Sequence, residues 1–136
     1  MIYLTRYVHF NAAHKLYNPK WDEEKNIEVF GKCANTNWHG HNYELIVTLK
    51  GEVNEDTGFL IDAKLVCKIL DEQVCEKLDH KNLNLDVEFM KDTMSSTENL
   101  AIAIWNQITP HLPPNVKLHR VKLFETPRIC AEYYGN

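Results

Sequence analysis

Polar and apolar residues alternate along two segments in the first half of the chain, residues 2–14, where Arg6 interrupts the pattern, and residues 38–50. The positions that share the apolar parity are Ile2, Leu4, Val8, Phe10, Ala12 and His14 in the first segment, and His39, His41, Tyr43, Leu45, Val47 and Leu49 in the second. Alternation of this kind is typical of a strand with one buried face. Because no helical pattern separates the two segments, we expect them to pair antiparallel.

Two later segments have the helical period instead. Apolar residues step by three and four between Leu65 and Leu78, which predicts a helix over 63–78 with Asp62 as its N-cap. Ser95 and Glu98 form a capping-box pattern ahead of a second helix. Prolines from residue 110 onward end that helix.

The remaining segments complete the expected order of elements. Residues 15–37 are rich in Asn, Lys, Glu and Gly, so we expect a long loop there. Residues 116–126 alternate again and predict a third strand, with one further strand that the pattern does not mark. Strands and helices in this order predict an α+β fold with an antiparallel sheet.

Length and charge limit the possible functions. A chain of 136 residues that is 44% hydrophobic fits one globular domain, 1–136. Fifteen basic residues against nineteen acidic ones give a net charge of −4, which disfavours nucleic acid as a partner. No apolar run is long enough for a membrane helix, and the opening segment lacks the features of a signal peptide. We therefore expect a cytoplasmic protein with no membrane partner.

Histidines suggest metal chemistry. In a strand, His39 and His41 point to the same face, so both imidazoles can reach one ion. His14 lies at the end of the preceding predicted strand, on the apolar parity. Three histidines with one open position are typical of catalytic zinc sites. The alternative is a set of ordinary strand histidines.

Cysteine and carboxylate positions add further candidates. Cys33 lies in the loop ahead of His39, and beside a cation its thiolate could act as a fourth ligand or as a base. The alternative is an inert loop cysteine. The other cysteines, Cys67, Cys75 and Cys130, are interpreted as packing residues.

Two acidic positions also deserve a chemical interpretation. Asp79 and His80 are adjacent after a helix, where the carboxylate could orient the imidazole or His80 could simply complement the helix dipole. Glu125 falls on the apolar parity of the last strand, so its carboxylate needs a partner. That partner could be a ligand with two adjacent N–H groups, or Arg6 or Arg120.

Together these pieces resemble the 6-pyruvoyl-tetrahydropterin synthase family. The matching segments run in the family's order over nearly the whole chain: FNAAH (10–14), CANTNWHGHNY (33–43), LDHKNLN (78–84), STENLA (96–101) and ETP (125–127). The resemblance implies that zinc is the cofactor, with His14, His39 and His41 as its ligands. It also implies that Cys33 is the catalytic base.

The same resemblance assigns the other candidates. Asp79 and His80 would complete the proton-transfer machinery, and Glu125 would anchor the 2-amino/N3 edge of the pterin. Thr97 and Glu98 would line or brace the pterin pocket. The implied fold is the tunnelling fold, an antiparallel sheet with two helices on one face, assembled as trimers that stack into a hexamer. Sites in this family lie between subunits, so His80 and Glu125 could serve a zinc ion held by a neighbour.

Two reactions fit the resemblance. One branch of the family converts 7,8-dihydroneopterin triphosphate to 6-pyruvoyltetrahydropterin, and a bacterial branch makes 6-carboxytetrahydropterin for queuosine synthesis. The five-residue spacer between Cys33 and His39 favours the first reaction, whereas the ETPR ending looks bacterial. A non-catalytic zinc-binding scaffold is the distant alternative. Because the substrate is a triphosphate, basic residues near the motifs are needed, and the candidates are Lys15, Lys32 and Arg128.

Overall fold

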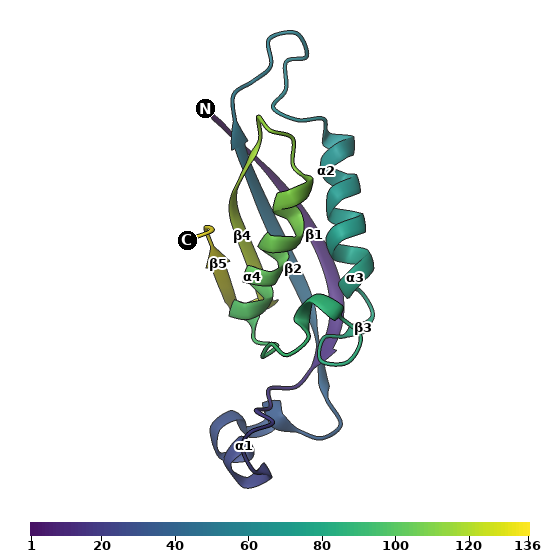
Figure 1. Cartoon of the computed structure of the whole chain (residues 1–136), viewed down its shortest axis with the longest axis vertical. Coiled ribbons are helices and arrows are strands. Elements are labelled where there is room, and N and C mark those ends of the chain that lie inside the picture. Colours follow the sequence, from purple (N-terminus) through teal and green to yellow (C-terminus); the bar gives the residue numbers. More distant parts are fainter.

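A five-stranded sheet in the order β3-β1-β2-β4-β5 forms the frame of the molecule. This computed structural model describes residues 1–136. The strands are β1 Ile2–His14, β2 His39–Gly51, β3 Lys81–Asn82, β4 Lys117–Thr126 and β5 Ile129–Tyr133. The helices are α1 Glu23–Phe30, α2 Ala63–Leu70, α3 Glu76–Leu78 and α4 Thr97–Ile108. In Figure 1, α2, α3 and α4 cover one face of the sheet, and α1 lies apart from it.

The two alternating segments pair as the sequence predicts. β1 and β2 form one antiparallel ladder from Ile2 opposite Gly51 to His14 opposite His39, without a shift in register. β4 extends the sheet beside β2, and β5 pairs with β4. The structure thus has two further strands, β3 and β5, where the pattern predicted one. The sheet is not wholly antiparallel, because the two-residue strand β3 runs parallel to the end of β1.

Helix boundaries agree with the sequence except in detail. Asp62 caps α2 by accepting a hydrogen bond from the backbone N–H of Lys64. The helix continues through a π-helical turn at Asp71–Cys75 into α3, so it spans 63–78 as expected. The expected capping box is wrong by one residue: Ser96, not Ser95, caps α4 and accepts from the N–H of Asn99. Ser95 is fully buried, and its hydroxyl donates a hydrogen bond to Oδ1 of Asn84 instead of capping the helix.

The segment expected to be a long loop instead contains a helix. Asp22 caps α1 by accepting from the N–H of Lys25, and two glutamates occupy the first turn. The fully buried Asn26 hydrogen-bonds to four backbone groups of residues 18–22 and so replaces a hydrophobic core for this small unit. We call residues 15–38 the arm. It projects beyond the end of the sheet (Figure 1).

A single apolar core fills the space between the sheet and the helices α2–α4. It includes Phe10, Leu45 and Val121 from the strands and Leu70 and Ile104 from the helices. The interpretation of Cys130 as a packing residue is wrong: it lies in β5 but is exposed. None of the helices has both the length and the apolar character that a membrane crossing requires.

Candidate metal and pterin site

Three histidines converge where β1 ends and β2 begins. His14 lies opposite His39 in the ladder, and His41 follows on the same face two residues later. Their ring centroids are 4.6 Å (His14–His39), 5.1 Å (His14–His41) and 5.0 Å (His39–His41) apart. Together with Glu125 they offer one ligand atom each, all within 4.8 Å of one another.

Unpartnered nitrogen atoms show that this cluster suits a metal ion. Nε2 of His14, Nε2 of His41 and both ring nitrogens of His39 are buried without a hydrogen bond. Buried polar atoms without partners are rare in folded proteins because each costs free energy. An ion coordinated by these nitrogens would satisfy them, so the residues fit a metal of the zinc type.

Glu125 completes the cluster from β4. Its Oε1 lies 2.9 Å from Nε2 of His41 and 3.4 Å from Nε2 of His14, without hydrogen-bond geometry, as expected for atoms that share an ion. Its Oε2 accepts a 2.7 Å hydrogen bond from the hydroxyl of Thr97. The carboxylate therefore has partners other than Arg6 or Arg120, the alternatives that the sequence left open.

Ser95 fixes the orientation of His14, a role that the sequence did not reveal. The backbone carbonyl of Ser95 lies 2.7 Å from Nδ1 of His14, which places the proton on Nδ1 and leaves Nε2 free for a metal. Burial lowers the pKa of His14 and that of His39, with the neighbouring imidazoles adding to the effect. Both rings are therefore biased toward the neutral form that binds metals.

A cavity of about 210 Å³ opens beside the cluster. It is lined in part by His14, Glu125, Thr97 and Glu98, so the structure brings together all three residues predicted to contact the pterin. Thr97 is buried at the start of α4, and Glu98 next to it is exposed. The cavity thus offers two carboxylates and a hydroxyl to a ligand next to the histidines.

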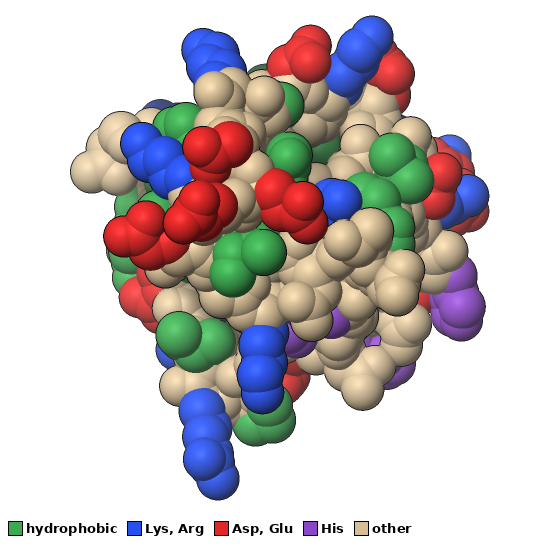
Figure 2. Space-filling model, turned by 90° about the horizontal axis from the view of Figure 1, so that it is seen from below, with side chains coloured by type: hydrophobic (Ala, Val, Ile, Leu, Met, Phe, Trp, Pro, Cys, Tyr) green, Lys and Arg blue, Asp and Glu red, His purple; other side chains and the backbone are tan.

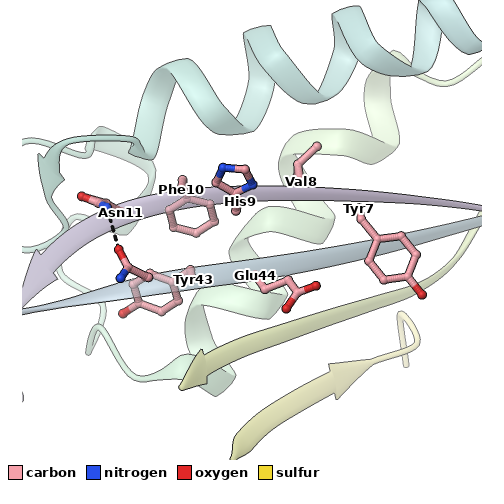
Figure 3. Close-up of a pocket in the computed structure, with 8 residues that line it drawn as sticks. Tyr7, Val8, His9, Phe10, Asn11, Tyr43 and Glu44 are labelled. Atoms are coloured by element: carbon pink, nitrogen blue, oxygen red, sulfur yellow. Dashed lines mark hydrogen bonds between the residues drawn. The ribbon is translucent and has the colours of Figure 1, made fainter. Parts of the chain in front are cut away.

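Two aromatic side chains, Phe10 and Tyr43, pack next to the histidine cluster. Tyr43 stacks on Phe10 across the β1–β2 ladder, with ring centroids 5.0 Å apart, and Figure 3 shows the two rings side by side. The Tyr43 ring also meets the edge of His41 at 5.7 Å. Burial and the nearby Glu125 raise the pKa of Tyr43, so its buried hydroxyl keeps its proton.

Cys33 lies in the arm, outside the group of converging ligand atoms. It is half-buried in a short 3-10 turn, Gly31–Ala34, and its carbonyl accepts a 2.7 Å hydrogen bond from the N–H of Leu16. This bond closes the base of the arm and ties Cys33 to the segment that follows His14. Glu125, not Cys33, belongs to the group of side chains that could hold a metal ion.

Asp79 and His80 form the expected pair, but they do not line the cavity beside the histidine cluster. Oδ2 of Asp79 lies 3.0 Å from Nδ1 of His80, whose side chain is 81% exposed. His80 has a φ of 60°, in the left-handed region that non-glycine residues rarely adopt. A hydrogen bond from the backbone of Asn11 to the carboxylate, assisted by the contact with His80, lowers the pKa of Asp79.

Asn11 holds this pair, which is the second role that the sequence did not reveal. Its N–H donates to Oδ1 of Asp79 at 2.9 Å, and its carbonyl accepts from the N–H of His80 at 2.7 Å. Its side chain donates to Oδ1 of Asn42 at 2.7 Å, the contact drawn in Figure 3. His80 lines a separate groove of about 460 Å³ beside β1 and β3, not the cavity next to Glu125.

Comparison with known proteins identifies the family. The family model for 6-pyruvoyl tetrahydropterin synthase matches residues 3–136. The chain belongs to the 6-pyruvoyl tetrahydropterin synthase family. It is 43% identical over 134 residues to the 6-pyruvoyl tetrahydrobiopterin synthase of Dictyostelium discoideum, covering 98% of this chain and 96% of that protein. It is 40% identical over 132 residues to the Homo sapiens protein of that name, covering 97% and 90%.

A solved structure confirms the fold. The 6-pyruvoyl tetrahydropterin synthase of Caenorhabditis elegans superposes with a TM-score of 0.93 at 39% identity, covering 99% of this chain and 96% of that chain. The α+β class and the tunnelling fold that the motifs implied are therefore confirmed. The chain is a lyase of the 6-pyruvoyl tetrahydropterin synthase type.

Proposed function

We propose that this protein is a zinc-dependent lyase that converts 7,8-dihydroneopterin triphosphate to 6-pyruvoyltetrahydropterin and releases triphosphate. The observation that carries the proposal is the convergence of His14, His39 and His41 with their metal-binding nitrogens unpartnered, next to a cavity with two carboxylates. Zinc held there would act as a Lewis acid on the hydroxyl oxygens of the substrate side chain and so make the neighbouring carbon-bound protons more acidic.

The chain's own residues would move the protons. Cys33, as a thiolate, would take a proton from a carbon of the substrate side chain. His80, held in orientation by Asp79, would exchange a proton at a second position. Elimination of the triphosphate and the tautomerisations that follow need no redox cofactor.

Carboxylates would bind the pterin ring. The pterin presents two parallel N–H donors, from its ring nitrogen and its 2-amino group, and one carboxylate can accept both. We assign this role to Glu125, with Thr97 as its brace through the 2.7 Å hydrogen bond and Glu98 on the adjoining wall. The proximity of Glu125 to the imidazoles makes Glu98 the second candidate for the same role.

The separation of His80 from the histidine cluster supports a shared site. Within one subunit, His80 lines the groove that also includes His41, whereas His14 and Glu125 line the other cavity. We propose a homohexamer, a dimer of trimers, in which the Asp79–His80 pair of one subunit faces the Cys33 and the zinc of another. The sheet is suited to such assembly, since its face opposite α2–α4 has no helical cover (Figure 1).

The decisive experiment is to incubate the zinc-loaded protein with 7,8-dihydroneopterin triphosphate and identify the product by mass spectrometry. A pyruvoyl product supports the proposal. A carboxy product with release of acetaldehyde would assign the chain to the queuosine branch. Zinc binding and oligomer formation without turnover would identify a scaffold. The five-residue spacer between Cys33 and His39 favours the first outcome. Cytoplasmic localisation, which we also propose, is testable by cell fractionation.

A further inference from the structure

Lys15 carries a positive charge that no carboxylate neutralises. The residue directly follows His14 at the base of the arm and is half-buried. Its Nζ lies 4.5 Å from the ring centroid of Trp38 and 5.1 Å from that of Tyr17. No acidic side chain lies within ion-pair distance of it. An ammonium ion held between aromatic faces in this way stays available to an anionic ligand.

The backbone of Lys15 is fixed by the residues that also fix the metal ligand. Asn84 accepts from the N–H of Lys15 at 3.2 Å and donates to its carbonyl at 3.1 Å. The hydroxyl of Ser95 donates to the same carbonyl at 3.2 Å, while the carbonyl of Ser95 holds His14. These bonds fix the backbone of Lys15 next to His14, and the position of its ammonium depends on the aromatic rings.

Trp38 adds a second sign of function. It directly precedes His39 and has a φ of 69°, a left-handed conformation that is unfavourable for a large side chain. Strained backbone of this kind occurs where the surrounding structure holds a residue for binding or catalysis. Here it places the indole against Lys15 at the pair of strand ends formed by His14 and His39.

The proposed substrate requires such a cation. It brings a triphosphate to a cavity that already contains the carboxylates of Glu98 and Glu125, in a chain of net charge −4. The other basic candidates, Lys32 and Arg128, are exposed on the surface. Figure 2 views the arm end of the molecule and shows histidine side chains with Lys or Arg side chains close by.

We infer that Lys15 binds the polyphosphate group of the substrate, and that Trp38 is the positioning residue that orients its ammonium. This inference rests on the proposed function, because the polyphosphate is that of the pterin substrate. It identifies the part of the site that distinguishes a phosphorylated pterin from an unphosphorylated one.

The test compares Lys15→Gln with Lys25→Gln in the zinc-loaded oligomer. Lys25 is a matched control, because its Nζ lies 4.4 Å from the ring of Trp21 in the same arm but is remote in sequence from the histidines. For Lys15→Gln we expect KM for the triphosphate substrate to rise about tenfold with kcat little changed, and high salt to reduce the difference. Binding of biopterin, which has no phosphate, should be unchanged. Lys25→Gln should behave as wild type.

Trp38→Leu should raise KM less than Lys15→Gln does, and Lys15→Arg should restore most of the binding. If Lys15→Gln loses zinc or its oligomeric state, these two variants carry the test. An unchanged KM in Lys15→Gln, or an equal loss for biopterin, would overturn the assignment of Lys15.

Calorimetry with inorganic tripolyphosphate separates this inference from the proposed function, provided that zinc content is measured before and after the titration. If wild type does not turn over the substrate but Lys15→Gln still weakens tripolyphosphate binding about tenfold, the function fails and the anion site stands. If wild type turns over the substrate and both proteins bind tripolyphosphate equally, the function stands and the role of Lys15 fails.

Discussion

The two groups of candidate site residues, the histidine cluster and the Asp79–His80 pair, differ in how much of their surroundings a single subunit provides. The histidine cluster is enclosed: His14 is 1% exposed, its ring is oriented by Ser95, and Glu125 completes the set of ligand atoms. The Asp79–His80 pair is open: its imidazole is 81% exposed and lines a surface groove that His41 also borders. A single subunit therefore brings together side chains that could hold a metal ion, whereas its Asp79–His80 pair lies on the surface.

Removal of a histidine ligand should have the largest effect. We expect His39→Ala to lose both zinc and all measurable turnover, because it removes one of the three imidazoles proposed to hold the ion. Zinc content is measured by atomic absorption and activity by product formation. His111→Ala, at an exposed position, is the control and should keep both. Retention of full zinc by a variant without His14, His39 and His41 would contradict the metal assignment.

Removal of the proposed base, Cys33, should abolish most turnover without affecting zinc binding. Cys33→Ala should keep zinc and lose about 10²- to 10⁴-fold in turnover, the usual contribution of a general base. Loss of zinc with the activity would instead make Cys33 a ligand. Cys67→Ala is the control and should be active.

Mixed oligomers test whether the two groups meet between subunits. Cys33→Ala and His80→Ala should each be nearly inactive alone. If the site is shared, unfolding and refolding the two variants together should restore activity, because some interfaces then combine an intact Cys33 with an intact His80. If each subunit uses its own pair, the mixture should stay as inactive as its components.

The carboxylates of the cavity should have a smaller effect, on ligand affinity. We expect Glu125→Gln to weaken biopterin binding at least tenfold, about 1.4 kcal/mol, because the amide accepts through one oxygen only. Zinc content and oligomer size should not change. Calorimetry on Glu98→Gln in parallel shows which carboxylate anchors the ring, and a fall in zinc content in Glu125→Gln alone would assign that residue to the metal.

The smallest expected effect is on the stability of the folded protein, through the carboxylate of Asp79. The lowered pKa of Asp79 means that its carboxylate stabilises the folded protein above the ordinary aspartate pKa and ceases to do so as the pH falls through the lowered value. Asp79→Asn should therefore have a slightly lower urea midpoint than wild type at neutral pH, and the two midpoints should converge in acid. Unfolding curves at both pH values check this. A difference that persists unchanged in acid would attribute the effect of Asp79 to something other than its charge.

Local sequence patterns predicted the enclosed region better than the open one. The alternation that defined β1 and β2 also placed His14, His39 and His41 on one face, since strand parity is a strictly local property. The contact of Ser95 with His14 was not predictable, because it depends on how α4 is placed on the sheet. The helix α1 was missed although Asp22 is a standard cap, because the segment has little apolar periodicity and a buried Asn26 in place of a core.

Because the β1–β2 ladder has no shift in register, the two strands tolerate no change in length, whereas the arm between them does. His14 and His39 form its last pair, so one residue inserted or deleted within either strand would turn metal ligands to the opposite face. The arm begins and ends at that same pair, and its length can change with little cost in loop-closure entropy and without moving the histidines. We therefore expect natural length variation among relatives, and successful engineered insertions, to fall in exposed parts of the arm and to be absent from the strands.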